Sequence, residues 1–398
     1  MWIPETAEEL EATVAAGSLE ETNTLEAKQQ FPSNKKLAKE IAALANDGGV
    51  LLIGVAEDEH DRLTKLNPVK LQGARERIDQ IIQTSIQETL SVEIRALELE
   101  GDPSRGYLVI IVPASPRAPH MVIVGKDNRY YGRGDNTVRR LSEGEVARLY
   151  ARREKWEIDR VAWMRSIIDD SPVVESSENG FLHIAIRPLF SSDSILEQAL
   201  YSSDAASVDE LLRTLLLRSA EKITLRCPDV PSLRIVEWHE NVSGWISYLD
   251  RSGDLGEVRE PDYIVDLHVN RSGEVRLFCG YAVLNHHSHD MVIRGQLVAH
   301  LCMLVLRFTS EILSQSENLH PVAIGLGLTN TKDAALWEQA KQGRPWDKFV
   351  RSDVAEYVKT DQVSPLSIAR EPQRVASALT RQLFSGLSDG QYDPFGLN

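Results

Sequence analysis

Cysteine is scarce in this sequence, and its scarcity excludes several kinds of protein. Three cysteines, at positions 227, 279 and 302, occur in 398 residues and in no spacing that is typical of a metal site. An odd number of widely separated cysteines is typical of a reducing compartment rather than of a disulfide-stapled secreted fold. The N-terminus, MWIPETAEELEATV, is acidic and lacks the basic start and apolar core of a signal peptide. We therefore expect a soluble, cytoplasmic protein.

Long apolar runs, nucleotide-binding motifs and positive net charge are missing as well. The most apolar segment, QLVAHLCMLVLRF, is interrupted by His300, and it is predicted to be too short to span a bilayer. No GxxxxGK[ST] P-loop and no GxSxG nucleophile elbow occurs. The net charge of −15 argues against a uniformly basic nucleic-acid coat protein, although it is compatible with a local basic groove.

The first part of the chain predicts an α/β lobe over residues 1–155. SNKKLAKEIAALAND predicts an amphipathic helix, because Leu37, Ile41 and Leu44 form one stripe and Ser33 is a typical N-cap. NDGG then predicts a tight turn, and VLLIGV predicts a strand buried on both faces. Strands are expected at VEIRALELE and GYLVIIVPAS, a hairpin at HMVIV and RYYGR, and a long helix after them.

The second part has a different texture. The polar segment DDSPVVESSENG, residues 169–180, marks a break, and residues 156–180 are predicted to be a helical linker. Residues 181–398 contain many strand-like segments, an NRSG hairpin turn and one apolar helix. We therefore predict an α+β protein whose second domain has a largely antiparallel sheet.

Acidic residues gather around one predicted strand. Glu21 and Glu26 lie in LEETNTLEAK, and Glu57 and Asp58 follow the buried strand. Carboxylates that are brought together repel one another unless a cation lies between them, and a hard divalent cation takes oxygen ligands. Lys28 would share a face with Glu26 on an extended segment and could hold a phosphate oxygen. From the acids alone, the simpler interpretation is solvated surface acids with Lys28 as their ion-pair partner.

Basic residues form two candidate phosphate-binding groups. The first group is interleaved with Tyr130 and Tyr131, and the second lies on the polar side of the first predicted helix. Such mixtures of cations and aromatic rings are typical of surfaces that grip a phosphate backbone and stack on bases. A solvated loop and a solvated helix face are the alternatives. The candidates are Lys126, Arg129, Tyr131, Arg133, Arg139 and Arg140 in the first group, and Lys35, Lys36 and Lys39 in the second.

The order of these pieces resembles the AlbA-type domain of the Schlafen family. The resemblance rests on the Glu-Thr pair, a second Glu five residues later in LEAK, ALANDGG, VLLIGVAED and RYYGRGDNTVRRLSEGEVARLY, and it spans about residues 18–150. It implies nucleic-acid binding and, as in nuclease-active members, a metal-dependent site that cuts structured RNA such as transfer RNA. The catalytic positions would be Glu21, Glu26 and Glu57. Because the third acid of the family is usually Asp, Asp58 is the alternative to Glu57.

These implications together predict an endoribonuclease that uses Mg²⁺ or Mn²⁺ on tRNA-like RNA. Arg133 occupies the aromatic-x-Arg-Gly position of the family. Larger Schlafen proteins form an RNA cradle from two lobes, so a single lobe predicts a homodimer. The C-terminal domain would sense a trigger or partner, as in bacterial defence or toxin effectors. Two alternatives stay open: a DNA-binding transcriptional regulator without catalysis, and a catalytically inert assembly protein.

Overall fold

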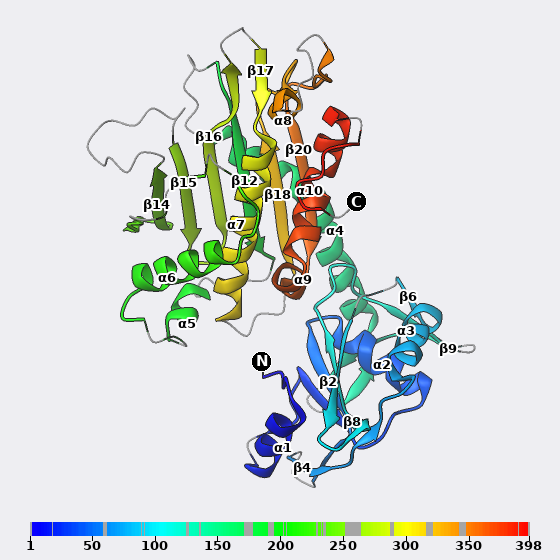
Figure 1. Cartoon of the computed structure of the whole chain (residues 1–398). Coiled ribbons are helices and arrows are strands. Elements are labelled where there is room, and N and C mark those ends of the chain that lie inside the picture. Colours follow the sequence, from blue (N-terminus) through cyan, green and yellow to red (C-terminus); the bar gives the residue numbers. More distant parts are fainter. Residues whose placement is uncertain are drawn as a thin grey trace. The chain divides into compact units, whose positions relative to one another are not determined.

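The computed structural model forms two compact units (Figure 1). The first consists mainly of Met1–Glu157 and the second mainly of Ile158–Asn318 and Val322–Asn398. The residues that the structure describes are 2–17, 19–58, 62–88, 90, 92–124, 127–134, 137–170, 178–189, 195–201, 203, 205–227, 230–231, 233, 236–250, 264–286, 290–315, 321–341, 348–388 and 390–396.

The first unit is built on a five-stranded sheet. Its strands are β1 (Leu25–Lys28), β2 (Gly49–Ile53), β8 (Asp102–Val112) and β5 (Val69–Lys70) in spatial order, with β7 (Glu93–Leu99) also paired to β8. β1 and β2 run parallel, whereas the other pairs are antiparallel. Every residue of β2 is buried, which confirms the strand predicted from VLLIGV.

Smaller elements complete this unit. They are α1 (Ala7–Ala15), α2 (Asn34–Leu44) and α3 (Ala74–Ser85), the sheet of β11 (Val138–Arg140), β10 (Asp127–Arg133), β9 (Met121–Val124) and β6 (Ile86–Gln87), and the pair β3 (Val55–Glu57) and β4 (Leu63–Leu66). Helix α2 begins at the predicted Ser33 cap and buries its predicted apolar stripe.

The turn after α2 also agrees with the prediction. The N–H of Gly48 donates to the carbonyl of Leu44 at 2.7 Å, and Gly48 has a left-handed φ of 87°. A Cβ on Gly49 would lie 2.8 Å from the Thr24 carbonyl oxygen, so the chain preceding β1 approaches too closely for a side chain. These glycines therefore place β2 directly beside β1.

The second unit contains a nine-stranded sheet. Its main order is β13 (His239–Glu240), β14 (Gly244–Asp250), β15 (Ile264–Asn270), β16 (Val275–His286), β12 (Gly180–Pro188), β18 (Val322–Leu328) and β20 (Tyr357–Val363), while β17 (Asp290–Ile293) joins β16 to β19 (Ala335–Leu336). All pairs except β17–β19 are antiparallel, as the strand-like segments predicted.

Helices cover one face of this sheet (Figure 1). They are α5 (Ile195–Tyr201), α6 (Val208–Glu221), α7 (Gly295–Ser314), α9 (Pro365–Arg370) and α10 (Pro372–Ser388), with the short α8 (Trp337–Lys341) beyond them. Helix α7 is 20 residues long and is apolar enough to cross a membrane, so the prediction that this segment is too short was wrong. In this structure 72% of the most apolar 18-residue stretch of α7 is buried, as in a core helix.

The opposite face is partly covered by α4 (Glu143–Asp169), which runs through residues predicted to be a linker. Met164 and Ile168 are buried against this face together with Ala185 and Ala323. A Cβ on Gly325 would lie 2.6 Å from the Met164 sulfur. Glycine in β18 therefore lets the helix approach the sheet closely, and the last turns of α4 belong to the core of the second unit.

Candidate active site

Strand β1 and the segment before it carry two of the four acidic residues singled out from the sequence, Glu26 and Glu21. Glu26 and Lys28 lie on the same face of β1, and the Lys28 ammonium donates a hydrogen bond to Oε1 of Glu26. This contact confirms the prediction from strand alternation. Glu26 is 3% exposed and Glu21 is 8% exposed, so these two are not solvated surface acids. The simpler interpretation is therefore wrong about solvation for both acids, whereas its prediction that Lys28 is an ion-pair partner is confirmed for Glu26.

Arg133 reaches this cluster from β10, far along the chain. Its Nη1 atom donates to Oε2 of Glu26 and lies 3.6 Å from Oε2 of Glu40, while Nη2 donates to the Thr22 carbonyl at 2.9 Å. The Arg133 side chain is 7% exposed. Burial lowers the pKa of its guanidinium, which nevertheless stays charged at neutral pH. Each oxygen of Glu26 is thus held by a cation.

Glu21 meets a second carboxyl group, that of Glu57 at the end of β3. The Glu57 carboxyl group lies within hydrogen-bonding reach of the Glu21 carboxyl group, and the N–H of Ala27 donates to Oε1 of Glu21 at 2.6 Å. Burial, followed by this contact with Glu57, raises the pKa of Glu21 to about 7, although the Ala27 N–H and the charge of Lys28 act against the rise. Two carboxyl groups in contact share a proton readily, and they are equally suited to share a cation.

Asp58 faces a different partner. Its Oδ1 atom accepts the backbone N–H of Arg62 at 3.1 Å, and its Oδ2 atom lies 3.4 Å from Nε of the same residue. The contact with Glu21 is made by Glu57, the position where the sequence departs from the family pattern. The structure therefore pairs Glu57 with the cluster and Asp58 with the β3–β4 turn.

Glu40, on α2, was not singled out from the sequence. Its side chain is 12% exposed, and burial raises its pKa against the opposing charges of Lys28, Lys36 and Lys39. Its Oε2 atom is buried and has no hydrogen-bond partner among the described residues. The sequence did contain an indication of this role, because Glu40 is the only acid in NKKLAKEIAAL and directly precedes the buried Ile41.

Comparison with known protein families assigns this part of the chain. Residues 21–142 match the family model described as Schlafen, AlbA_2. The N-terminal unit carries a Schlafen AlbA_2 domain. The match includes every residue of the acidic cluster, and the rest of the chain is unassigned. No curated protein matches the chain. The domain indicates a nucleic-acid-binding or nuclease-like role.

The second predicted basic group lies on α2 of the AlbA_2 domain. Lys35 and Lys36 are exposed, whereas Lys39 places its ammonium 4.7 Å from the centre of the Tyr131 ring. Tyr131 is only 4% exposed and belongs to the hydrophobic core. Its ring is therefore closed to an incoming base, and the predicted stacking role of Tyr131 is wrong in this structure.

The remaining basic candidates are dispersed. Arg139 is held by Glu145 through two hydrogen bonds, of 3.0 and 2.6 Å, whereas Arg129 and Arg140 are exposed. Lys126 lies outside the described residues. Of this group, the structure brings only Arg133 into the acidic cluster.

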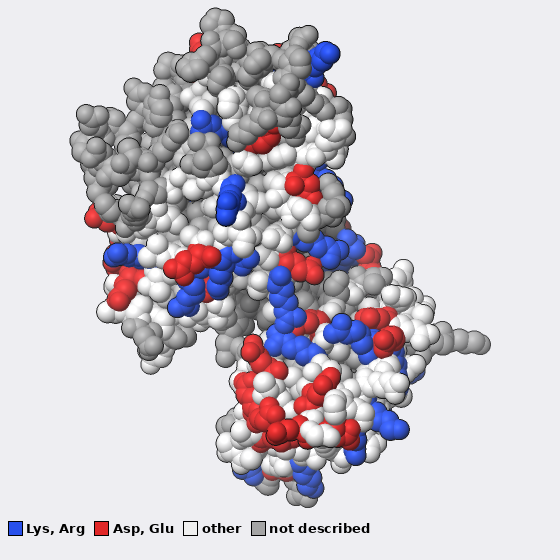
Figure 2. Space-filling model, viewed as in Figure 1, with Lys and Arg blue, Asp and Glu red and all other residues white. Residues whose placement is uncertain are grey.

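Acidic side chains also shape the surface of the AlbA_2 domain. Figure 2 shows Asp and Glu gathered over α1 and β4 on the face in view. Glu5, Glu8 and Glu9 at the start of α1 are exposed. A polyanion is repelled from such a region, so nucleic acid is expected to approach the domain elsewhere.

The donor set can be compared with the needs of a divalent cation. Among the described residues, no three His, Cys, Asp or Glu side chains are arranged to hold a metal, and Glu26 is occupied by Lys28 and Arg133. The Glu21–Glu57 pair supplies two carboxylates. Mg²⁺ is commonly bound by one or two carboxylates together with water and substrate phosphates. The pair therefore fits such an ion, and the predicted metal site stays a prediction.

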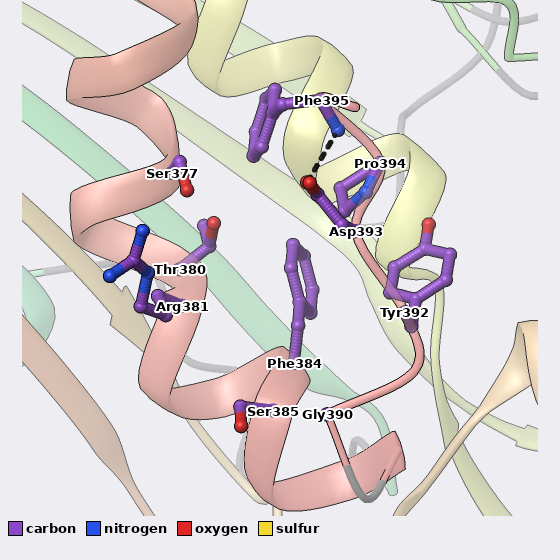
Figure 3. A pocket seen from close by; sticks show the side chains of 10 residues that line it. All are labelled: Ser377, Thr380, Arg381, Phe384, Ser385, Gly390, Tyr392, Asp393, Pro394 and Phe395. Carbon is purple, nitrogen blue, oxygen red and sulfur yellow. Dashed lines mark hydrogen bonds between the residues drawn. The ribbon is translucent and has the colours of Figure 1, made fainter. Parts of the chain in front are cut away.

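A pocket of about 240 Å³ lies in the second unit, between α10 and the C-terminal segment (Figure 3). Phe384, Tyr392 and Phe395 supply aromatic surface, and Arg381 and Asp393 supply charge. Figure 3 shows Phe384 pointing from α10 toward the C-terminal segment, where the N–H of Phe395 donates to Asp393 at 2.9 Å. Mixed aromatic and charged walls are typical of small-molecule sites.

Proposed function

We propose that the AlbA_2 domain hydrolyses phosphodiester bonds in structured, tRNA-like RNA with the help of Mg²⁺ or Mn²⁺. The observation that supports this most is the contact between the Glu21 and Glu57 carboxyl groups, next to the cations Lys28 and Arg133. Oxygen ligands beside fixed positive charges are what phosphoryl chemistry requires.

The residues divide into two roles. Glu21 and Glu57 would hold the divalent ion, which when bound supplies charge neutralisation on the phosphate and an activated water. Lys28 and Arg133 would bind phosphate oxygens, and Arg133 offers the planar fork that fits a phosphate in a bidentate manner. Glu26 orients both cations, because each of its oxygens is bonded to one of them.

We further propose a cytoplasmic defence or toxin effector that works as a homodimer and is controlled through its second unit. A dimer would supply the second lobe that larger Schlafen proteins contain within one chain. The pocket lined by Phe384, Tyr392 and Phe395 is where a small trigger molecule would bind the second unit.

Cleavage of total transfer RNA by the full chain, with Mn²⁺ or with EDTA, tests the proposed reaction. We expect Glu21→Gln and Glu57→Gln to lower the cleavage rate at least about 10²-fold. Asp58→Asn is the matched control, because it changes charge in the same way one residue from Glu57 and should keep the wild-type rate. A second pair of substrates, one transfer-RNA hairpin and a DNA hairpin of the same sequence, shows whether the protein cuts RNA or DNA.

Other results would support the rival functions. Salt-sensitive binding of DNA without cleavage in any metal would favour a transcriptional regulator. No binding of either nucleic acid would favour an inert assembly protein. Equal cleavage by wild type and the Glu21→Gln variant would place the chemistry outside this cluster.

A further inference from the structure

The last strand of the second unit's sheet, β20, has one edge to which no strand among the described residues is paired. On its other side β20 pairs with β18. Helix α10 lies on one face of β20, where the Tyr357 hydroxyl donates to the Leu379 carbonyl at 2.7 Å. Helix α4 lies on the opposite face, where Nη1 of Arg160 donates to Oε1 of Gln362 at 3.4 Å. The two faces are therefore occupied, whereas the edge offers backbone groups to another chain.

The hydrogen bonds of β18 show which residues of β20 turn their backbone outward. The N–H of Thr329, directly after β18, donates to a β12 carbonyl at 3.0 Å, so odd-numbered residues of β18 bond to β12 and even-numbered ones to β20. In the register of β18 with β20, the backbone groups of Val358, Thr360 and Gln362 therefore point away from β18. The N–H of Gln362 agrees with this, because it donates to Oδ1 of Asp361 at 2.8 Å.

The sequence of β20 is self-complementary about its central residue, Thr360. When Thr360 of two copies lies opposite itself in an antiparallel pair, each Lys359 lies opposite Asp361 of the second copy. Tyr357 and Val363 then lie opposite each other at both ends. Lys359 and Asp361 share one face of the sheet, and neither has an ion-pair partner among the described residues. Opposite charges directly across an antiparallel pair stabilise it.

Other registers of the same pair are penalised. A slide of two residues in either direction would place Lys359 opposite Lys359, or Asp361 opposite Asp361, and like charges in this position destabilise the pair. Lysine on an edge strand ordinarily discourages pairing, but Asp361 removes that effect in the centred register. Strand β7, which is paired only to β8, lacks this symmetry, because about its central residue Ile94 would face the charged Glu98.

We propose that β20 of two copies of this chain pair edge to edge in antiparallel orientation, centred on Thr360, so that one continuous sheet joins the copies. The proposal rests on the proposed function in one respect, the homodimer, and it names the surface of that dimer. Such a contact is isologous and closes the assembly at two copies. The outward backbone groups of Val358, Thr360 and Gln362 would supply its hydrogen bonds, as in other complexes formed by strand addition.

Sedimentation velocity of the full chain over a concentration series tests this surface with two charge variants. Lys359→Glu places acid opposite acid and Asp361→Lys places lysine opposite lysine, so each variant alone should raise the dimer dissociation constant at least about tenfold. In an equimolar mixture, a heterodimer of the two variants has opposite charges in both pairs. The dissociation constant of the mixture should therefore return to within about threefold of the wild-type value.

Arg213→Glu is the matched control for these variants. It makes the same change of charge as Lys359→Glu at an exposed position of α6, which lies toward β14 and β15 rather than β20 (Figure 1). We expect it to leave the dimer dissociation constant within about twofold of the wild-type value.

Hydrogen exchange of the wild type follows the strand itself. Raising the concentration from well below to well above the dissociation constant should slow exchange of a peptide covering β20 about tenfold, because N–H groups that face solvent in one copy become bonded in two. A peptide covering β12, which is paired on both sides, should be unchanged. Exchange of β20 that ignores concentration while dimers form would overturn the contact.

The remaining outcomes separate this contact from the proposed function. Wild-type affinity in both single variants, or a mixture no tighter than either variant alone, would overturn the β20 contact and leave a homodimer through another surface. A wild type that stays monomeric at every concentration would overturn both the contact and the homodimer. Dimers that show the rescue in the mixture but cut no RNA would refute the proposed reaction and leave the contact supported.

Discussion

Removing Arg133 should destabilise the AlbA_2 domain strongly, because Glu26 is buried. The Arg133→Met variant keeps most of the side-chain volume but deletes the cation on Oε2 of Glu26, a residue that is 3% exposed. Breaking a buried ion pair on one side typically costs 3–5 kcal/mol, whereas an exposed pair is worth 1 kcal/mol or less. Lys28 still holds the other oxygen, so we expect about 3 kcal/mol, at the lower end of the buried range.

Native-state hydrogen exchange in the full chain measures this loss locally. A cost of about 3 kcal/mol corresponds to about a hundredfold faster exchange of peptides covering β1 and β2. Peptides covering β12 and β18 belong to the second unit and should be unchanged. The double variant Arg133→Met/Glu26→Gln removes the buried charge as well and should recover more than half of the protection. Exchange faster by less than threefold in Arg133→Met would refute the claim that the ion pair is buried.

Three further predictions concern the second unit, and urea unfolding followed by tryptophan fluorescence checks each. Gly325→Val should destabilise it by about 2 kcal/mol, because the new side chain would collide with Met164. Gly386→Ala should stabilise it by about 0.5–1 kcal/mol, since this exposed helical position has open space around it; a loss there would contradict the packing described. Burial lowers the pKa of His183 to about 4, from an ordinary 6.5. The unfolded chain therefore binds the extra proton between these values, and stability should be intact above pH 6.5 and fall by about 3 kcal/mol as the pH drops to 4. His183→Gln should remove that slope. Asp266, whose pKa burial raises to about 7, acts in the opposite direction, so the difference between wild type and variant is the quantity to compare.

Local patterns predicted the elements around the cluster well. Period-3.6 and period-2 spacing located α2 and β2, the NDGG turn joined them, and strand alternation placed Glu26 beside Lys28. These features depend on residues close in sequence, for which spacing and capping chemistry are informative. The antiparallel character of the second sheet followed in the same way from strand-like segments and turn signals.

Long-range features were not accessible in this way. Nothing local to Glu40 shows that Arg133, more than 90 residues later, approaches it, and nothing local to RYYG shows that Tyr131 packs into the core under Lys39. The glycines of AIGLGL were visible in the sequence, but their purpose depends on α4, which packs onto them. Burial and tertiary partners decide these cases, and a single sequence carries little information about either.

The charge balance around β1 links RNA binding to the divalent cation. Among the described residues, the carboxyl groups that meet there outnumber the cations in contact with them: Glu21, Glu26, Glu40 and Glu57 against Lys28 and Arg133. A phosphate brought into this cluster would add negative charge where it is already in excess, and the repulsion is strong at short range in a partly buried place. A bound divalent cation would neutralise that excess of two negative charges. RNA held at the cluster should therefore dissociate in EDTA and bind in Mn²⁺, whereas RNA held by the exposed lysines of α2 would respond to salt and ignore EDTA. The measurement is filter binding with wild-type protein and an RNA with a non-hydrolysable backbone, so that Lys28 stays in place and no RNA is cut. Equal binding in EDTA and Mn²⁺ would place the RNA on α2 rather than on the carboxylates.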